Sequence, residues 1–344
     1  MENSKNITYL LGAGASFNSC PILKELGEKM VLMARNYLGD SAIDFPNRSI
    51  SQEDDENLIW NIGYFGMKAI KYGTIDTYAK KLQLNNSRNE LNELKLAVSV
   101  FFTIWQLTDD FEIKFRGDNY LDDIDRRYIS LMASIIENIG KGNNRIKKNI
   151  KFVSWNYDLQ LELAFKSFCN DNLIWDELSD YLGYRCKDKS SYDLDICHLN
   201  GYCGYYKTSN EEQHILDRSK STELGAIIKE IAFVQKSLRH KAIDFSSHIN
   251  YAWETSDLAK AARNSAGLIF SQTDILVIIG YSFPSFNKEI DKWLFEKLNG
   301  RLTKIIFQDP NASMTFINQL VNTNLTEIIC MNDRMDSFYL PYEF

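Results

Sequence analysis

Short apolar runs and longer helical patterns alternate along most of the chain. The first run covers residues 7–11, and comparable runs stand at residues 150–155, 194–199, 275–279, 304–307 and 327–331. Short apolar runs bounded by turn residues are typical of buried strands. Because helical patterns separate most of these runs, the chain predicts an α/β fold with a Rossmann-like, mostly parallel sheet.

The pattern changes in the middle of the chain, where helical periodicity replaces the strands. Ser87 and Glu90 have the spacing of a capping box. An apolar stripe follows them, and such a stripe packs into a core. We therefore predict a single domain over residues 1–344 with a helical insertion at residues 47–148. The stripe includes Phe101, Phe102 and Trp105.

Composition and charge favour a soluble globular protein. Apolar residues make up 44% and charged residues 25% of the chain, and the net charge of −7 disfavours direct nucleic-acid binding. No apolar run approaches the roughly 20 residues of a membrane-spanning helix. The first six residues are polar and lack a signal-peptide core. We expect a cytoplasmic protein that does not contact a membrane.

The six cysteines argue against a zinc site. Cys186, Cys197 and Cys203 cluster loosely, but no two cysteines have the close spacing of a zinc knuckle. We expect reduced thiols and no bound metal.

A glycine-rich turn follows the first apolar run and precedes a helical pattern that begins at Pro21. Small residues let a backbone approach a pyrophosphate, whose charge the N–H groups of the next helix can meet. A tight turn without a ligand would have the same sequence, so both interpretations stay open. The turn consists of Gly12, Ala13, Gly14, Ala15 and Ser16.

Two further strand ends carry groups for proton chemistry. Asn156 and Asp158 follow residues 150–155 and can direct an amide and a carboxylate to one place. His198, one of four histidines, ends another run and can take a proton near neutral pH. The alternatives are an Asx turn at Asn156 and a hydrogen-bonded structural histidine.

The last two strand ends suit a ribose or a phosphate. Gly280 and Ser282 follow residues 275–279, and Asp309 follows residues 304–307. A carboxylate in this place often accepts hydrogen bonds from ribose hydroxyls. An ordinary strand-to-helix turn remains the alternative.

Together and in this order, the segments resemble the SIR2-like (sirtuin-fold) family. Residues 155–158 correspond to its Thr-Gln-Asn-Ile-Asp-type segment, residues 198–201 to its His-Gly segment and residues 280–283 to its Gly-Thr/Tyr-Ser segment. The four-cysteine zinc module of sirtuin deacylases is missing. The Gly-Tyr-Ser-Phe-Pro ending looks like bacterial SIR2-like effectors of anti-phage defence, and in that branch the resemblance implies hydrolysis of NAD+.

The resemblance also implies a role for each residue. Asn156 would orient water or the nicotinamide ribose, Asp158 would favour the developing positive charge, and His198 would accept a proton. The pyrophosphate would lie on Gly12, Ala13, Gly14, Ala15 and Ser16, and the adenosine end on Gly280, Ser282 and Asp309. Asp76 is a weaker candidate, for which a helix N-cap is the simpler explanation.

Other functions remain as alternatives. A zinc-free deacylase, an ADP-ribosyltransferase or a non-catalytic NAD- or ADP-ribose-binding subunit would use the same site. A dehydrogenase is disfavoured because the later glycine of the full fingerprint is absent. A constitutive NADase would kill its host, so we expect control by a sensor or activator partner or by homo-oligomeric assembly.

Overall fold

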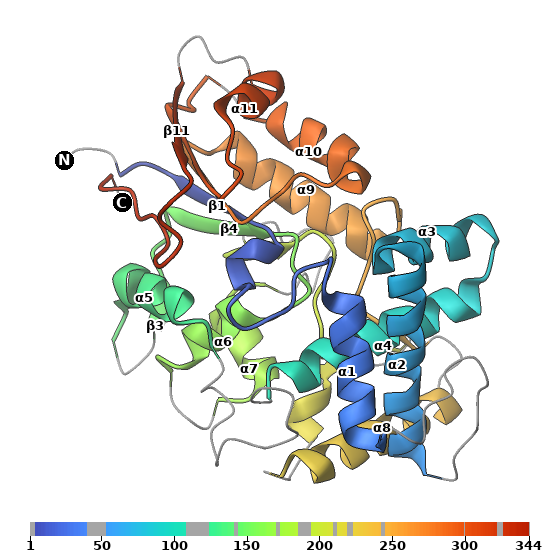
Figure 1. The fold of residues 1–344 in the computed structure, drawn as a ribbon. Coiled ribbons are helices and arrows are strands. Elements are labelled where there is room, and N and C mark those ends of the chain that lie inside the picture. Colours follow the sequence, from blue (N-terminus) through green and yellow to red (C-terminus); the bar gives the residue numbers. More distant parts are fainter. Residues whose placement is uncertain are drawn as a thin grey trace. The chain divides into compact units, whose positions relative to one another are not determined.

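Six parallel strands form one central sheet, in the order β11-β10-β9-β1-β4-β5 (Figure 1). The structure is a computed structural model that describes residues 4–39, 53–107, 124–140, 144–169, 173–184, 194–208, 212–218, 223–241, 245–298, 300–321 and 326–343. The strands are β1 (Ile7–Leu11), β4 (Ile150–Ser154), β5 (Ile196–His198), β9 (Ile275–Ile279), β10 (Lys304–Gln308) and β11 (Glu327–Met331).

The strand order reverses at β1. The chain adds β4 and β5 on one side of β1, and then adds β9, β10 and β11 on the other. This is the order of the doubly wound dinucleotide-binding sheets, which bind their ligands beyond the carboxyl ends of the strands where the order reverses. The α/β fold that the sequence predicts is therefore confirmed, and all five strand pairings of this sheet are parallel.

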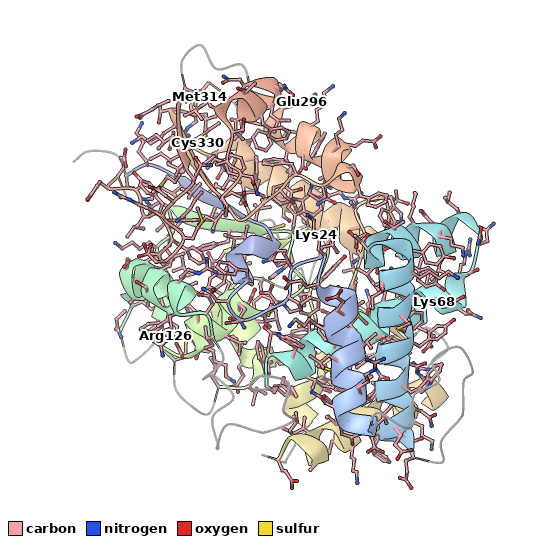
Figure 2. All side chains as sticks on the ribbon, in the orientation of Figure 1. Lys24, Lys68, Arg126, Glu296, Met314 and Cys330 are labelled. Atoms are coloured by element: carbon pink, nitrogen blue, oxygen red, sulfur yellow. The ribbon has the colours of Figure 1, made fainter. Side chains whose placement is uncertain are left out.

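Helices cover both faces of the sheet (Figure 1). On one face, α9 (Asp257–Ser271), α10 (Lys288–Phe295) and α11 (Met314–Leu320) pack on alternate strand residues. Met314 and Glu296 mark the exposed outer side of this layer (Figure 2). The other face carries α5 (Arg126–Ile135), α6 (Gln160–Lys166) and α7 (Trp175–Tyr181), beside the short pair β2 (Ile136–Asn138) and β3 (Asn144–Ile146).

The chain divides into two compact units, of which the sheet belongs to the first. This unit comprises Met1–Ser16, Asp125–Gly201 and Asn250–Phe344. The second unit comprises Phe17–Ile124 and Tyr202–Ile249. It contains α1 (Leu26–Leu38), α2 (Asp54–Tyr72), α3 (Ile75–Leu84), α4 (Arg88–Trp105), α8 (Leu224–Lys241) and a small sheet of β6 (Tyr205–Lys207), β7 (Glu212–His214) and β8 (Ser246–Ser247).

The second unit overlaps the predicted insertion at residues 47–148 without sharing its boundaries. Its first segment runs from Phe17 to Ile124, and its second segment, residues 202–249, lies outside the predicted insertion. The organisation as one domain over residues 1–344 stays a prediction. The aromatic stripe of α4 is buried, as expected, and comprises Phe101, Phe102 and Trp105.

Two helix starts differ from those that the sequence predicts. Ser87 precedes α4 but makes no capping bond with its side chain, and Glu90 accepts a hydrogen bond from the Tyr78 hydroxyl (2.6 Å), so the predicted capping box does not form. The N-cap of α3 is Thr74, whose hydroxyl accepts from the Thr77 N–H. Asp76 therefore lies in the first turn and is not the cap.

Candidate active site

The loops that follow β1, β4, β5 and β9 meet at the carboxyl edge of the sheet. The Gly12 N–H donates to the Ile279 carbonyl (3.0 Å), and the Trp155 N–H donates to the Leu11 carbonyl (3.0 Å). The Leu199 N–H donates in the same way to the Ser154 carbonyl (2.9 Å). Segments that are far apart in sequence are thus joined by backbone hydrogen bonds into one edge.

Three glycines allow the turns after β1 and β9 to touch. The Gly14 N–H donates to the Gly280 carbonyl (2.9 Å). A Cβ at Gly12 would lie 2.5 Å from the Gly280 oxygen, and one at Gly280 would lie 2.2 Å from the Ala15 nitrogen. Gly280 also has φ +58, a conformation that other residues rarely adopt. These glycines are needed for close contact between two loops, a reason that the motif alone does not reveal.

The helix expected to begin at Pro21 begins later in the chain. Its N-terminal N–H groups therefore do not directly follow the glycine-rich turn, where they were expected to meet a pyrophosphate. After β1 the chain forms a short 3₁₀ helix, Ala13–Ser16, and then crosses into the second unit. The α-helix α1 begins only at Leu26. The amides nearest the glycine-rich turn are therefore those of the turn itself.

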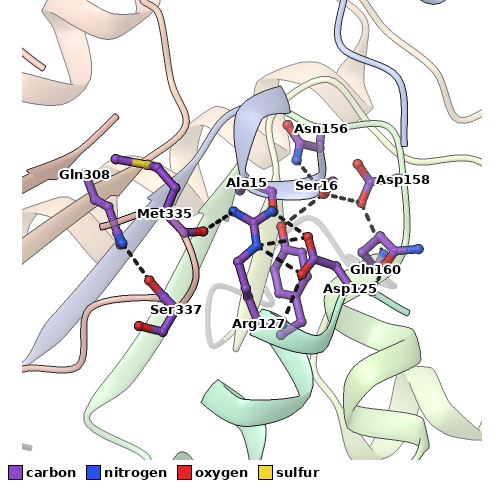
Figure 3. A network of polar contacts seen from close by, with 11 residues as sticks. Ala15, Ser16, Asp125, Arg127, Asn156, Asp158, Gln160, Gln308, Met335 and Ser337 are labelled. Carbon is purple, nitrogen blue, oxygen red and sulfur yellow. Dashed lines mark hydrogen bonds and ion pairs between the residues drawn. The ribbon is translucent and has the colours of Figure 1, made fainter. Parts of the chain in front are cut away.

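Ser16 joins the glycine-rich turn to the residues after β4 (Figure 3). Its hydroxyl donates to Oδ1 of Asp158 (3.1 Å) and accepts from Nδ2 of Asn156 (3.2 Å). The Tyr128 hydroxyl lies 3.1 Å from the same oxygen. Ser16, Asn156 and Asp158 are all buried. Their hydrogen bonds show that the structure brings these three predicted residues into direct contact.

The Asp158 carboxyl has an unusual acidity. Burial raises its pKa to about 6 and outweighs the lowering by hydrogen bonds from the Gln160 N–H and the Ser16 hydroxyl. The charge of Glu162 also raises this pKa, and His198 lowers it. A carboxyl that titrates near neutrality is typical of functional sites.

An arginine that the sequence reasoning missed supports the turn from α5 (Figure 3). Nη2 of Arg127 donates to the Ala15 carbonyl (2.8 Å), and Nη1 donates to the Met335 carbonyl (3.3 Å). The same guanidinium pairs with Asp125, and both side chains are buried. Nothing in the local sequence predicts the contacts with Ala15 and Met335, because both lie more than a hundred residues away.

His198 lies at the end of β5 and faces α6. Its Nε2 is 2.6 Å from Oε1 of Glu162, and its Nδ1 is 3.4 Å from the Asn156 carbonyl oxygen. Burial lowers the pKa of His198, but the charge and hydrogen bond of Glu162, the Asn156 carbonyl and Asp158 together raise it above its ordinary value. The general-base role of His198 stays a prediction. Glu162 carries no sequence signal, because its contact with His198 depends on how β4 and β5 pair.

Two amide oxygens are buried at this edge without a hydrogen-bond partner among the described residues. They are Oδ1 of Asn156 and Oδ1 of Asn200. An unsatisfied buried acceptor costs about 1–3 kcal/mol, so a ligand that supplies a donor gains by meeting it. Asn200 was not among the predicted site residues, although it directly precedes Gly201 at the end of a strand.

The two remaining predicted residues, Ser282 and Asp309, also belong to the first unit. Ser282 is exposed in the turn after β9. Asp309 directly follows β10, and its Oδ1 accepts a hydrogen bond from the Asn311 N–H (2.7 Å) that closes a turn. β9 separates β10 from β1, so Asp309 is about 10 Å along the edge from the glycine-rich turn.

Within the described ranges, no three His, Cys, Asp or Glu residues are grouped so that they could hold a metal ion. The five cysteines that the structure describes form no disulfide. Cys186 lies outside the described residues. In the part of the chain with assigned structure, no helix has both the length and the apolar composition to cross a bilayer.

No protein-family model matches this chain, and none of the curated proteins matches it. Among solved structures, the chain is similar to that of SIR2 in complex with the inhibitor EX-527, 2′-O-acetyl-ADP-ribose and a deacetylated p53 peptide. The two are 10% identical over 97% of this chain and 90% of the other, with a TM-score of 0.40. At this similarity, fold and site rest on the chain's own geometry.

Proposed function

We propose that this chain is an NAD+ glycohydrolase that cleaves NAD+ to nicotinamide and ADP-ribose. One observation carries the proposal. In the loop after β4, next to the strand β1 at which the sheet reverses its order, the buried amide of Asn156 has an oxygen without a partner among the described residues, beside the Asp158 carboxyl. The order of the family-like segments along the sequence supports the same substrate.

The residues at the edge fit a dinucleotide. The unpartnered oxygens of Asn156 and Asn200 are acceptors for ribose hydroxyls or for the nicotinamide carboxamide. Gly12, Gly14 and Ser16 belong to the turn after β1, whose backbone holds the pyrophosphate in this proposal. Ser282 and Asp309 continue along the edge toward the adenosine end. NAD+ is the substrate, and no metal enters the proposal.

Cleavage of the nicotinamide–ribose bond makes modest demands on the protein. The leaving group already carries a positive charge, so no acid needs to protonate it. The protein must orient the ribose and one water, exclude bulk solvent and favour the developing positive charge. Asn156 orients the water or the ribose, and the Asp158 carboxylate supplies the negative charge. His198 is the third residue, and its chemistry depends on its protonation state.

The test is incubation of the purified chain with NAD+ over a range of protein concentrations, with nicotinamide and ADP-ribose quantified by chromatography. Asn156→Ala is expected to lower the rate about 10²–10⁴-fold, because it removes the amide that orients the reactants. A matched control is Asp274→Asn. This buried carboxylate precedes β9 at the opposite edge of the sheet and binds the Asn6 N–H and Arg301. It is expected to keep wild-type turnover.

The products distinguish the alternatives. Acetyl-ADP-ribose formed with an acetylated peptide would indicate a deacylase, and labelled protein would indicate a transferase. Tight NAD+ binding without turnover under every condition would indicate a binding subunit. Each of these results would overturn the proposal.

We further propose that the enzyme acts in the cytoplasm as an abortive-infection effector of an anti-phage defence system. Depletion of NAD+ stops the infected cell from supporting the phage. Because unregulated turnover would kill the host, a partner subunit or homo-oligomeric assembly switches it on. The test is NAD+ loss in cells that carry the gene with its genomic neighbours, measured with and without infection.

A further inference from the structure

Glu162 and His198 form a buried pair beneath the carboxyl edge. Their side chains are 0% and 2% exposed, and Oε1 lies 2.6 Å from Nε2. Glu162 belongs to α6, which follows the Asn156–Asp158 loop, and His198 pairs in register with Ser154 of β4. The pair thus joins α6 to the end of β5, beside the loop after β4 that carries Asn156 and Asp158.

The contacts of the imidazole ring determine its protonation. Nε2 faces the Glu162 carboxylate, and Nδ1 faces the carbonyl oxygen of Asn156 at 3.4 Å. A carboxylate and a carbonyl oxygen only accept hydrogen bonds, whereas a neutral imidazole has one N–H to donate. A neutral ring would therefore turn a lone pair toward one of these oxygens. Only the doubly protonated ring donates to both.

We propose that Glu162 is a positioning residue: its carboxylate keeps His198 as an imidazolium, which holds the Asn156 backbone carbonyl and so fixes the Asn156 amide for catalysis. This inference rests on the proposed function and deepens it. In this arrangement His198 exchanges no proton with the substrate. The proton on Nδ1 stays in a hydrogen bond to the Asn156 carbonyl throughout the reaction.

The charged groups around the ring agree with this assignment. From α6, Glu162 contacts it directly, and from the loop after β4, Asp158 adds a second negative charge. From α5, Tyr128 approaches Asp158 only through the Ser16 hydroxyl, and Arg127 is paired with Asp125. Although burial lowers the pKa of His198, the two carboxylates and the carbonyl oxygen raise it overall.

The two possible roles of His198 give opposite pH dependences. As a general base, His198 must be neutral, so kcat would rise with pH through its pKa. As an imidazolium clamp it must be charged, so kcat falls as pH rises through that pKa. The Asp158 carboxyl, with a pKa of about 6, adds a rising limb at lower pH. The clamp therefore predicts a bell-shaped profile whose falling limb belongs to His198.

The experiment compares kcat and KM between pH 5 and 9 for wild type, Glu162→Gln and the control Asp274→Asn. In Glu162→Gln the falling limb is expected to move about one pH unit or more toward acid, with the loss confined to kcat. Asp274→Asn is expected to keep the wild-type profile. A rising limb assigned to His198, or an unmoved falling limb in Glu162→Gln, would overturn the inference.

A second measurement does not depend on turnover or on a folded Glu162 variant. The imidazole nitrogens of the four histidines are followed by NMR during a pH titration of the wild type, with His198→Gln used to assign the signal. We expect His198 to carry both ring protons at pH 7. A neutral ring at pH 7 would disprove the clamp even if NAD+ is cleaved. Absence of NAD+ cleavage with a charged ring would instead count against the proposed function alone.

Discussion

Asp158 is a carboxyl that folding makes harder to ionise. Its Oδ1 accepts both hydrogen bonds, one from the Ser16 hydroxyl and one from the Gln160 N–H. Even so, burial raises its pKa to about 6. Near neutral pH the Asp158 side chain is therefore mostly a buried anion, and its charge lowers the stability of the folded state. In the proposed reaction this charge favours the positive charge that develops on the substrate.

We predict that Asp158→Asn stabilises the fold and removes activity. An amide keeps Oδ1 for both hydrogen bonds and loses the charge, so at pH 7.5 the gain is on the order of 1–2 kcal/mol. In the wild type, the stability tied to Asp158 is present below about pH 4 and is lost as pH rises through about 6. Urea unfolding at several pH values measures this slope. Equal slopes in variant and wild type would contradict the prediction.

Asn200 is a second residue whose role becomes visible only in the structure. Its Oδ1 is buried without a partner among the described residues, and its carbonyl accepts from the Asn250 N–H (2.8 Å). We predict that Asn200→Ala raises KM for NAD+ about tenfold, the effect of one lost hydrogen bond. Thermal stability should not fall, because no internal hydrogen bond of this oxygen is removed. Isothermal titration with a non-hydrolysable NAD+ analogue and a melting curve check both parts; unchanged affinity would exclude Asn200 from the site.

At the scale of elements, the turns after β1 and β9 act as one structure. The backbones touch at Gly12, Gly14 and Gly280, and the next residue, Tyr281, donates to the buried carboxylate of Asp291 (2.8 Å). Burial raises the pKa of Asp291 to about 7, against the lowering by the Tyr281 hydrogen bond. The turn after β9 is thus fixed both by its neighbour and by α10.

This contact gives a direct test with a matched control. Gly280→Ala places a Cβ 2.2 Å from the Ala15 nitrogen at a φ of +58, so we predict a loss of about 3 kcal/mol or more in unfolding free energy. Gly300→Ala meets nothing within 4 Å and should change stability by less than about 0.5 kcal/mol. Chemical denaturation of both variants measures the difference, and similar midpoints would refute the close packing of the two turns.

The sequence predicts elements better than contacts. The runs at β1, β9 and β11 match the observed strands residue for residue, because each is a short apolar segment between polar ones. The grouping of Asn156, Asp158 and Ser16 follows from strand order. Glu162 and Arg127 could not be found in this way, since each meets its partner only through sheet register or helix packing.

At the scale of the molecule, the chain crosses between the two units four times. The chain leaves the first unit after Ser16 and after Gly201, and it returns at Asp125 and Asn250. Asp125 forms an ion pair with Arg127, and the Asn250 N–H donates a hydrogen bond to the Asn200 carbonyl. The residues of the first unit at these crossings are thus candidate site residues or contact residues beside them.

The last prediction concerns the proposed control of turnover by a partner or by a second copy. We predict that NAD+ cleavage per chain is low in dilute solution and rises about tenfold or more when the protein assembles or meets its activator. If assembly orders the four crossings and so fixes Ser16, Asn200 and Asp125, the onset of activity should coincide with slower hydrogen exchange there. The measurement combines initial rates over a concentration series, mass photometry for assembly state and exchange mass spectrometry at each concentration, with Asn156→Ala as the inactive control. Exchange at the crossings should slow in Asn156→Ala as well, because assembly does not require turnover. A dilute monomer that cleaves NAD+ at the full rate would show that neither assembly nor a partner controls this chain.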